Sequence, residues 1–249
     1  MSLTIVKFIK DSIIPTSKLL YRDYIQLNSL QCSNKKHSFC QQAINRTKEN
    51  IGEKLLTRHN MNITFSDEDR SKYDETENKK LTCFINPLEG YNNFINAIPN
   101  FSIVIYLQDT RNNISICVID FPASNETLFA INSTGAFFES NKEYKTYTKK
   151  LKISPGIKKT NINGKIISFE GEINQLLEHE NLIEKDSNIR IFGSKTFAAN
   201  LVFNNKINKT ILLNNDIPTF KAISLISKEY GCKIKKINDK SKDIIISNE

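Results

Sequence analysis

The sequence predicts an α/β protein in which layered sheets are covered by helices. Two helical patterns open the chain, a series of short apolar strands follows, and strands then alternate with helices. This order favours packed layers, because every sheet has to bury an apolar face against another element. The 249 residues suffice for one large domain or two small ones, each with its own core.

Apolar residues at helical spacing predict two helices at the start of the chain. The first pattern extends from Ile5 to Leu20, and Pro15 is expected to kink or end that helix. The second helix is predicted over residues 38–59, where apolar side chains recur on one face. Residues 66–80 are polar and are predicted to form a loop.

Short apolar runs bounded by turn residues predict an antiparallel meander after this loop. Its strands are expected at residues 81–85, 101–107, 114–120, 127–131 and 136–138. The polar residues 108–113 are expected to join two of them as a hairpin.

The chain beyond residue 150 is predicted to form a second lobe. A polar stretch over residues 150–165 separates an N-terminal α+β lobe, residues 1–150, from a C-terminal α/β lobe, residues 151–249. Strands are expected at residues 165–169, 189–192, 207–213 and 243–247, and helices at residues 173–182, 196–203 and 218–230. Pro218 is tolerated in the first turn of the last helix, and Gly231 is a natural stop for it.

Composition excludes several classes of protein. The hydrophobic share of 39% and the charged share of 25% are ordinary for a globular protein. No apolar run approaches the ~20 residues that span a bilayer, and the charged first 20 residues are typical of an amphipathic helix rather than a secretory signal. We therefore expect a cytoplasmic protein without a membrane partner. The five cysteines form no C-x-x-C pair, so neither a zinc site nor a disulfide framework is expected.

The formal net charge of +8 raises the possibility of a nucleic-acid ligand. Lysine, asparagine and isoleucine are all abundant, however, and all three have A/T-rich codons. A biased genome would raise them together, so we interpret the lysine clusters as solvated surface. A nucleic-acid-binding module unrelated to phosphate esters remains an alternative that depends on charge alone.

The segment from Asn86 to Phe94, N-P-L-E-G-Y-N-N-F, is the most informative in the chain. It follows a predicted strand and is expected to turn sharply. A strand that delivers a carboxylate and a glycine at its C-terminal end is a common way to build a phosphate or metal site. The segment resembles the D-P-x-D-G-T-x-N-F motif of the inositol monophosphatase family, including its bacterial extragenic-suppressor branch.

Further motifs resemble the same family in the same order. Residues 66–68, S-D-E, are similar to its G-E-E loop, and residues 190–194, R-I-F-G-S, to its R-x-x-G-[ST] turn. Residues 218–222 and 229–232 resemble its closing W-D-x-A-A and E-A-G-G motifs. The resemblance covers most of the chain and implies a layered α/β sandwich of the inositol monophosphatase (sugar phosphatase) type, with magnesium-dependent phosphatase activity.

The resemblance also implies site residues. Carboxylate oxygens of the family hold Mg²⁺, which polarises the phosphate and activates a water, while backbone N–H groups at a helix start meet the phosphate. The implied metal ligands are Asp67, Glu68, Asn86, the Leu88 carbonyl, Glu89 and Thr219. The implied catalytic residues are Glu68 and Tyr91, and the implied substrate-binding residues are Gly90, Tyr91, Asn92, Gly193 and Ser194.

The sequence departs from the family where the chemistry resides. Asn86 and Thr219 stand where the family has aspartates, Leu212 stands where it has a substrate-contacting glutamate, and Tyr91 replaces a threonine. Glu89 keeps its charge but is one methylene longer than the family's aspartate. One unit charge beside a dication is worth several kcal/mol even at an effective dielectric near ~20. Mg²⁺ binding is therefore expected to be weak or absent.

Two functions follow from this resemblance. The first is an inositol-monophosphatase-like protein with lost or strongly reduced phosphatase activity and a regulatory or binding role. Its implied partners are an inositol or sugar phosphate, the transcription machinery or RNA, and a second copy in a homodimer. The alternative is an active Mg²⁺-dependent phosphatase with altered ligands, for which Asp69 or Asp216 would have to compensate.

Overall fold

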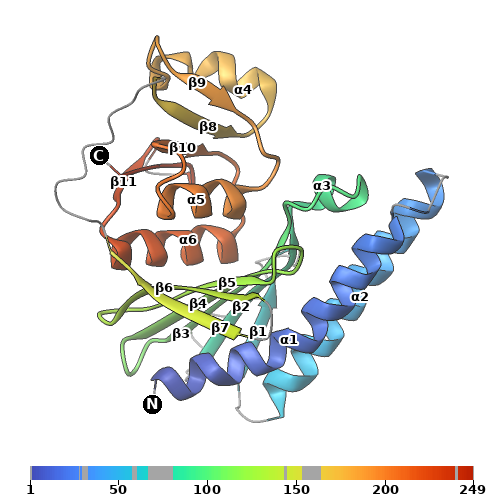
Figure 1. The fold of residues 1–249 in the computed structure, drawn as a ribbon. Coiled ribbons are helices and arrows are strands. Elements are labelled where there is room, and N and C mark those ends of the chain that lie inside the picture. Colours follow the sequence, from blue (N-terminus) through green and yellow to red (C-terminus); the bar gives the residue numbers. More distant parts are fainter. Residues whose placement is uncertain are drawn as a thin grey trace.

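A seven-stranded sheet is the largest element of the fold (Figure 1). The computed structural model describes residues 2–27, 29, 33–57, 61–66, 81–142, 145–152, 164–238 and 241–248. The strands follow one another in chain order across the sheet; β1 is parallel to β2, and every other neighbouring pair is antiparallel. They are β1 (Met61–Phe65), β2 (Leu81–Glu89), β3 (Ser102–Asp109), β4 (Ile114–Phe121), β5 (Glu126–Ile131), β6 (Gly135–Lys142) and β7 (Lys145–Leu151).

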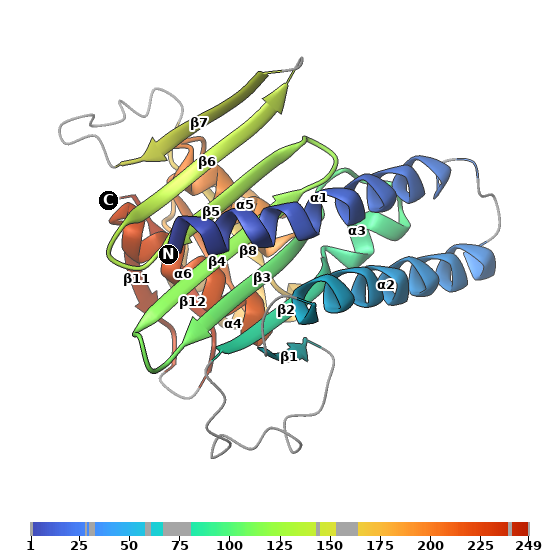
Figure 2. The same ribbon diagram turned by 90° about the horizontal axis from the view of Figure 1, so that it is seen from below.

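Two long helices, α1 (Ser2–Leu27) and α2 (Ser33–Leu56), cover one face of this sheet (Figure 2). Their apolar stripes and the side chains of that face form one buried cluster, in which Ile9, Leu55 and Val118 are fully buried. Burying such a stripe is what stabilises an amphipathic helix on a sheet. No helix in the described part of the chain is long and apolar enough to cross a membrane.

Pro15, which was expected to kink or end the first helix, lies inside α1 and does not end it. A proline removes one helical hydrogen bond and leaves the carbonyl four residues earlier without its donor. Both Pro15 and Asp11 are exposed, so water can hydrate that carbonyl. The burial of Ile13 and Leu20 on either side holds the helix against the sheet through the proline.

The second sheet has five strands in the order β11-β12-β10-β8-β9. Its central strands β8 and β10 are parallel, β9 is parallel to β8, and β12 is antiparallel to both β10 and β11. Its members are β8 (Ile166–Glu170), β9 (Asn188–Arg190), β10 (Lys209–Leu212), β11 (Lys233–Lys236) and β12 (Ile244–Ser247).

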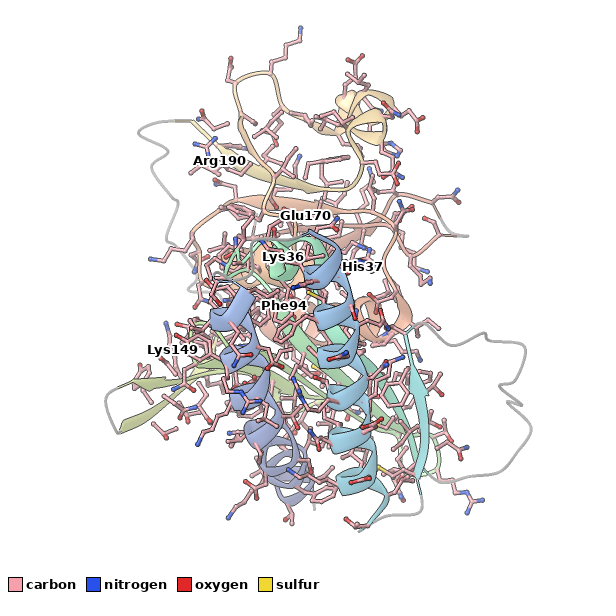
Figure 3. All side chains as sticks on the ribbon, turned by 90° about the vertical axis from the view of Figure 1, so that its right-hand side faces the viewer. Lys36, His37, Phe94, Lys149, Glu170 and Arg190 are labelled. Carbon is pink, nitrogen blue, oxygen red and sulfur yellow. The ribbon has the colours of Figure 1, made fainter. Side chains whose placement is uncertain are left out.

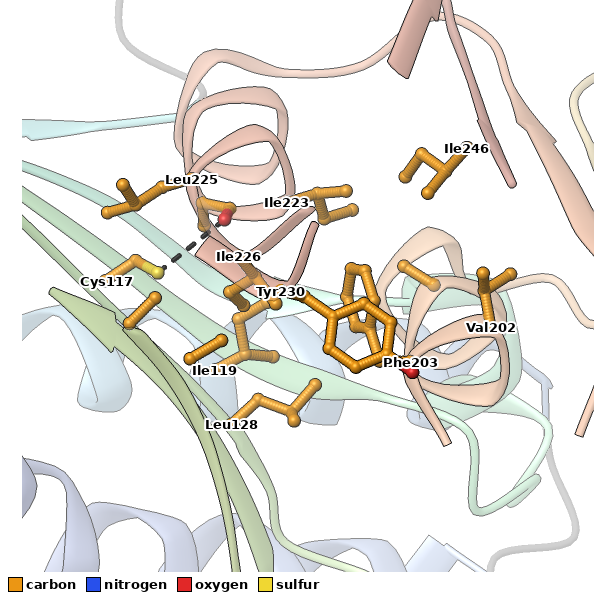
Figure 4. Close-up of a cluster of buried hydrophobic side chains, with 14 of the residues drawn as sticks. Cys117, Ile119, Leu128, Val202, Phe203, Ile223, Leu225, Ile226, Tyr230 and Ile246 are labelled. Atoms are coloured by element: carbon orange, nitrogen blue, oxygen red, sulfur yellow. Dashed lines mark hydrogen bonds between the residues drawn. The ribbon is translucent and has the colours of Figure 1, made fainter. Parts of the chain in front are cut away.

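Helices α5 (Lys195–Phe203) and α6 (Ile217–Tyr230) fill the layer between the two sheets (Figure 1). Figure 4 shows this layer, where Ile119 of the large sheet, Ile226 of α6 and Ile246 of the small sheet belong to one buried cluster. The Cys117 thiol donates to the Ala222 carbonyl oxygen over 3.6 Å there. A short helix, α4 (Ile173–Glu178), and the 3-10 turn η2 (Glu180–Leu182) precede β9 and pack against the outer face of the small sheet. The predicted layered α/β fold is confirmed.

Several element boundaries differ from the prediction. Helix α2 begins at Ser33 rather than at residue 38, and the predicted helix over residues 173–182 divides into α4 and η2. Strand β2 continues to Glu89 rather than ending at residue 85. Strands β1, β7 and β11 were not predicted. Residues 67–80 of the loop predicted over residues 66–80 lie outside the described residues.

Candidate active site

The informative motif forms the end of β2 and the start of the short helix α3 (Tyr91–Ile95). The chain turns at Gly90, which has a φ of 84°. A side-chain carbon at this position would lie 2.7 Å from the Asn100 carbonyl oxygen, so glycine alone fits the turn. The pairing of β2 with β3 shifts register between Asn86 and Glu89, where Pro87 lacks an N–H group. This irregularity brings Asn86 and Glu89 to the edge of the layer that contains α5 and α6.

Asn86 faces the start of α6. Its side-chain nitrogen donates to Asp216 Oδ2 over 3.0 Å and lies 3.5 Å from Thr219 Oγ1. Its Oδ1 accepts from the backbone N–H of Leu88 over 3.1 Å. Asp216 is the N-cap of α6, and its Oδ1 accepts from the Thr219 N–H over 2.9 Å. Both polar ends of the Asn86 amide and both oxygens of Asp216 are therefore engaged within the protein.

Glu89 points to the start of α5. Its carboxylate accepts from Ser194 Oγ and Thr196 Oγ1, each over 2.6 Å, and from the Lys195 N–H over 2.9 Å. The side chain is buried, and burial raises the pKa of its carboxyl, although the three donors and the Lys195 charge act in the opposite direction. Because the first N–H groups of a helix have no partner within the helix, a carboxylate at this position stabilises α5.

A second carboxylate, Glu170 at the end of β8, lies at the same helix start (Figure 3). Its Oε1 accepts from the Phe192 N–H over 3.0 Å and its Oε2 from the Gly193 N–H over 2.8 Å. Burial raises the pKa of this carboxyl to about 7; the backbone donors oppose the shift, and the nearby Glu89 adds to it. Glu89 and Glu170 together thus accept from three backbone N–H groups before and at the start of α5.

Glu170 was not predicted as a site residue, although the sequence contains a signal for it. Glu170 is followed by Gly171 at the end of a strand, just as Glu89 is followed by Gly90. The same rule that singled out Glu89 therefore applies to Glu170, since a carboxylate and a glycine at a strand end are typical of a ligand or helix-start site.

The residues implied to bind substrate lie around α3 and the start of α5. Tyr91 forms a hydrogen bond of 2.8 Å between its hydroxyl and His37 Nδ1 on α2, and Asn92 is exposed. Buried Asn93 donates to the carbonyl oxygens of Asn100 and Phe192, each over 2.8 Å. Gly193 packs against Asn93 with a φ of 71°. The structure therefore brings the α3 turn against the α5 turn.

Three acidic residues that the sequence pointed to lie outside the described residues, and two leucines are buried. Asp67, Glu68 and Asp69 belong to residues 67–80, which the structure does not describe. Leu88, whose carbonyl oxygen was the implied ligand, lies between Asn86 and Glu89 in β2, and its side chain is buried in the cluster beneath α1 and α2. Leu212 is fully buried in the layer between the sheets.

The described residues do not fit a cluster of magnesium ions. No group of three or more histidine, cysteine, aspartate or glutamate side chains suited to a metal occurs among them. Mg²⁺ needs oxygen ligands that point at it, whereas Asn86 presents N–H hydrogens to Asp216 and Glu89 accepts from α5. Asp216 Oδ2, which could otherwise bind a cation, accepts a hydrogen bond from the Asn86 amide instead.

Comparisons with known proteins agree with this fold. The model of the "Inositol monophosphatase family" matches residues 7–246. The inositol-1-monophosphatase of Caulobacter vibrioides is 26% identical over 227 residues, which are 91% of this chain and 87% of that protein. The fructose-1,6-bisphosphatase/inositol-1-monophosphatase of Thermotoga maritima is 29% identical over 170 residues, 66% of this chain and 62% of that protein. Among solved structures, the extragenic suppressor protein suhB of Bartonella henselae superposes with a TM-score of 0.76 at 20% identity, covering 99% of this chain and 94% of that one.

Proposed function

The chain belongs to the inositol monophosphatase family, and we propose that its phosphatase activity is lost or strongly reduced while the fold serves a binding or regulatory role. The proposal concerns this chain, whereas the named activities belong to its relatives. The metal chemistry that a phosphatase of this family would use requires anionic oxygens that converge on one point.

The contact between Asn86 and Asp216 carries this proposal. In place of a carboxylate that would share a cation with Asp216, Asn86 offers an N–H donor over 3.0 Å. A cation bound between them would have to displace this hydrogen bond and meet the positive end of the amide dipole. The contact therefore opposes metal binding and stabilises the metal-free site.

The start of α5 supports the proposal independently. Helix starts bind phosphate through N–H groups and the helix dipole. Here Glu170 and Glu89 already accept from the N–H groups of Phe192, Gly193 and Lys195. A phosphate dianion at this position would lose those donors and would be repelled by two carboxylates. The Asn86 contact thus disfavours the metal, and Glu89 and Glu170 disfavour an anionic substrate at the start of α5.

Turnover of inositol 1-phosphate at high Mg²⁺ tests the loss of activity. We expect no turnover above that of an Asp67→Asn/Glu68→Gln double variant. This variant removes the two negative charges of residues 67 and 68 but keeps the Glu89 contacts with α5. The Caulobacter inositol-1-monophosphatase, assayed in parallel, controls for the assay. Turnover at the level of that relative, abolished by the double variant, would establish the alternative of an active phosphatase with altered ligands.

The binding role is tested on the intact protein. We expect a complex with RNA or the transcription machinery, and association of RNA should weaken as salt rises if lysine–phosphate contacts contribute. Absence of RNA binding at low salt would remove the RNA version of this role. Size measurement by light scattering would test the homodimer that the resemblance implies.

A further inference from the structure

A cavity of about 660 Å³ lies between α1 and the large sheet, on the face opposite α5 and α6. Figure 2 shows α1 crossing this face, with β6 and β7 extending beyond it. The residues of the candidate active site are not among those that line the cavity. Its volume falls within the range of small-molecule sites and greatly exceeds that of a single ion.

The floor of the cavity is a row of polar side chains on four neighbouring strands. Asp120 of β4 stands opposite Thr127 of β5, Thr127 opposite Glu139 of β6, and Glu139 opposite Thr148 of β7. Side chains directly opposite one another on one face of a sheet are close enough to interact. Polar side chains would be unusual on this otherwise apolar face unless they had a partner.

One atom of this row lacks a partner. Asp120 is only 8% exposed; its Oδ1 accepts from Thr127 Oγ1 over 3.1 Å, whereas its Oδ2 has no hydrogen-bond partner among the described residues. Burial raises the pKa of Asp120 to about 6, and the hydroxyls of Ser17 and Thr127 act in the opposite direction without completing a bond to Oδ2. An unpaired buried acceptor is unfavourable, so this oxygen favours a ligand that donates a hydrogen bond.

The charged groups of the floor indicate that the donor of the ligand is positively charged. Lys10 Nζ of α1 lies 2.5 Å from Glu139 Oε2 and 5.0 Å from the centre of the Phe129 ring. Glu139 Oε2 also accepts from Thr148 Oγ1. The floor therefore contains two carboxyl groups, Asp120 and Glu139, and one lysine that is already paired. When Asp120 is ionised, one positive charge is missing, and a protonated amine would supply both that charge and the donor.

The mouth and walls define the rest of the ligand. Lys7 and Lys18, with Asp11, line the exposed part of α1 and give the mouth a net positive charge. Hydrocarbon side chains also line the cavity, among them those of Val6, Ile13 and Phe129. A ligand that fits this distribution has an amine at its inner end, an apolar body and an anionic group at its outer end.

We propose that the cavity beneath α1 binds a small zwitterion of the amino-acid class, with its ammonium group on Asp120 Oδ2, its apolar side chain against Phe129 and its carboxylate toward Lys7 and Lys18. This site is separate from the candidate active site and does not depend on whether phosphatase activity remains.

Leucine and two analogues test the proposal on the full chain: isopentylamine lacks the carboxylate, and 4-methylpentanoic acid lacks the amine. Binding is followed by NMR amide shifts at residues 120, 127 and 129, at concentrations up to about 10 mM, because so small a ligand is expected to bind weakly. We expect leucine to bind most tightly, the amine less tightly and the acid least. No shift for leucine or the amine would overturn the proposal and would indicate a cavity that holds water alone.

Variants separate the site from the rest of the surface. Asp120→Asn keeps the shape and the Thr127 contact but removes the anionic acceptor, so leucine should bind at least about tenfold more weakly. Ser17→Leu fills the cavity from α1 and keeps the Asp120 carboxylate, although it removes the Ser17 hydroxyl, and it should abolish binding even if Asp120→Asn fails to fold. Asp186→Asn, at an exposed residue that does not line the cavity, is the matched control and should leave leucine affinity unchanged. Unchanged affinity in both Asp120→Asn and Ser17→Leu would contradict the proposal.

Discussion

The side-chain nitrogen of Asn86 lies 3.0 Å from Asp216 Oδ2, across 130 residues of sequence, and joins the end of β2 to the start of α6. Donor and acceptor are matched to each other, since the amide gives a hydrogen bond and the carboxylate receives it. Exchanging the two residue types would therefore exchange the donor and the acceptor of this hydrogen bond.

Replacing Asn86 with aspartate should destabilise the protein. Asn86→Asp places a second carboxylate against Asp216 and removes the donor, which should lower the free energy of unfolding by on the order of 2 kcal/mol at pH 7. The swap Asn86→Asp/Asp216→Asn restores a donor and an acceptor, and an asparagine at position 216 can still cap α6. Urea denaturation of the two variants should show the double variant to be the more stable. A double variant as unstable as Asn86→Asp would contradict the paired geometry.

Restoring the two aspartates of the family motif should restore Mg²⁺ binding. Asn86→Asp/Thr219→Asp returns the two aspartates of the family motif beside Asp216. Calorimetric titration should detect Mg²⁺ or Mn²⁺ binding to this variant that is absent or much weaker in the parent protein, because each added charge beside a dication contributes several kcal/mol at an effective dielectric near ~20. Equal metal affinity in the two proteins would show that residues 86 and 219 do not occupy the family's metal positions.

Glu89 should contribute to stability through the start of α5. Glu89→Gln keeps the size of the side chain but leaves the Lys195 N–H or a hydroxyl facing an NH2 group, at a cost of about 1–3 kcal/mol. Exposed Glu53 on α2 offers the matched control, and Glu53→Gln should change the unfolding free energy by less than about 0.5 kcal/mol. Equal effects of the two variants would show that the α5 contacts contribute nothing.

The Gly193 turn should not tolerate a side chain. Gly193 has a φ of 71°, and an added carbon would lie 2.7 Å from Asn93 Oδ1. Gly193→Ala should therefore cost about 1–3 kcal/mol and weaken the packing of the α3 turn on the α5 turn. In Gly52→Ala, inside α2, the added carbon has its nearest neighbour at 3.9 Å, so this change should stabilise the protein by about 0.5–1 kcal/mol. Thermal unfolding should therefore show a lower melting temperature for Gly193→Ala and a higher one for Gly52→Ala.

Stability should fall as pH rises from about 4.5 to about 7, and the part of this fall above pH 6 should report mainly on Glu170. The folded-state pKa of Glu170 is raised to about 7 from the usual 4.5, so the folded protein binds this proton more tightly than the unfolded chain does. The protonated form stabilises the fold at low pH, and this contribution disappears as pH rises through that pKa. Asp120, with a pKa of about 6, completes most of its own change below pH 6. Urea denaturation between pH 5 and 8 should give a flatter profile for Glu170→Gln than for the parent protein; parallel profiles would contradict the assignment to Glu170.

The core elements could be predicted from the sequence because their burial leaves a periodic apolar pattern. Three strands that were not predicted, β1, β7 and β11, are all at the edge of a sheet. An edge strand pairs through its backbone on one side only and needs few buried side chains. Strand β11, Lys233–Lys236, is exposed along its whole length and contains three lysines, so its sequence carries no strand pattern.

The sequence singled out the two motif turns but not the hydrogen bonds that their side chains form. The motif turns do meet, as Asn93 and Gly193 demonstrate. The direction in which Glu89 points is set by Ser194 and Thr196, which are more than 100 residues away in the chain. A pattern of residue types fixes which side chains are near a turn, but the partner that each one selects depends on contacts that only the folded chain creates.

The position of α6 between the sheets has a consequence for synthesis. All seven strands of the large sheet precede α5 and α6 in the chain, so they leave the ribosome before the helices that cover their second face. Nascent chains halted before residue 217 should hence expose a broad apolar surface and recruit chaperones, and release from them should follow once α6 has emerged.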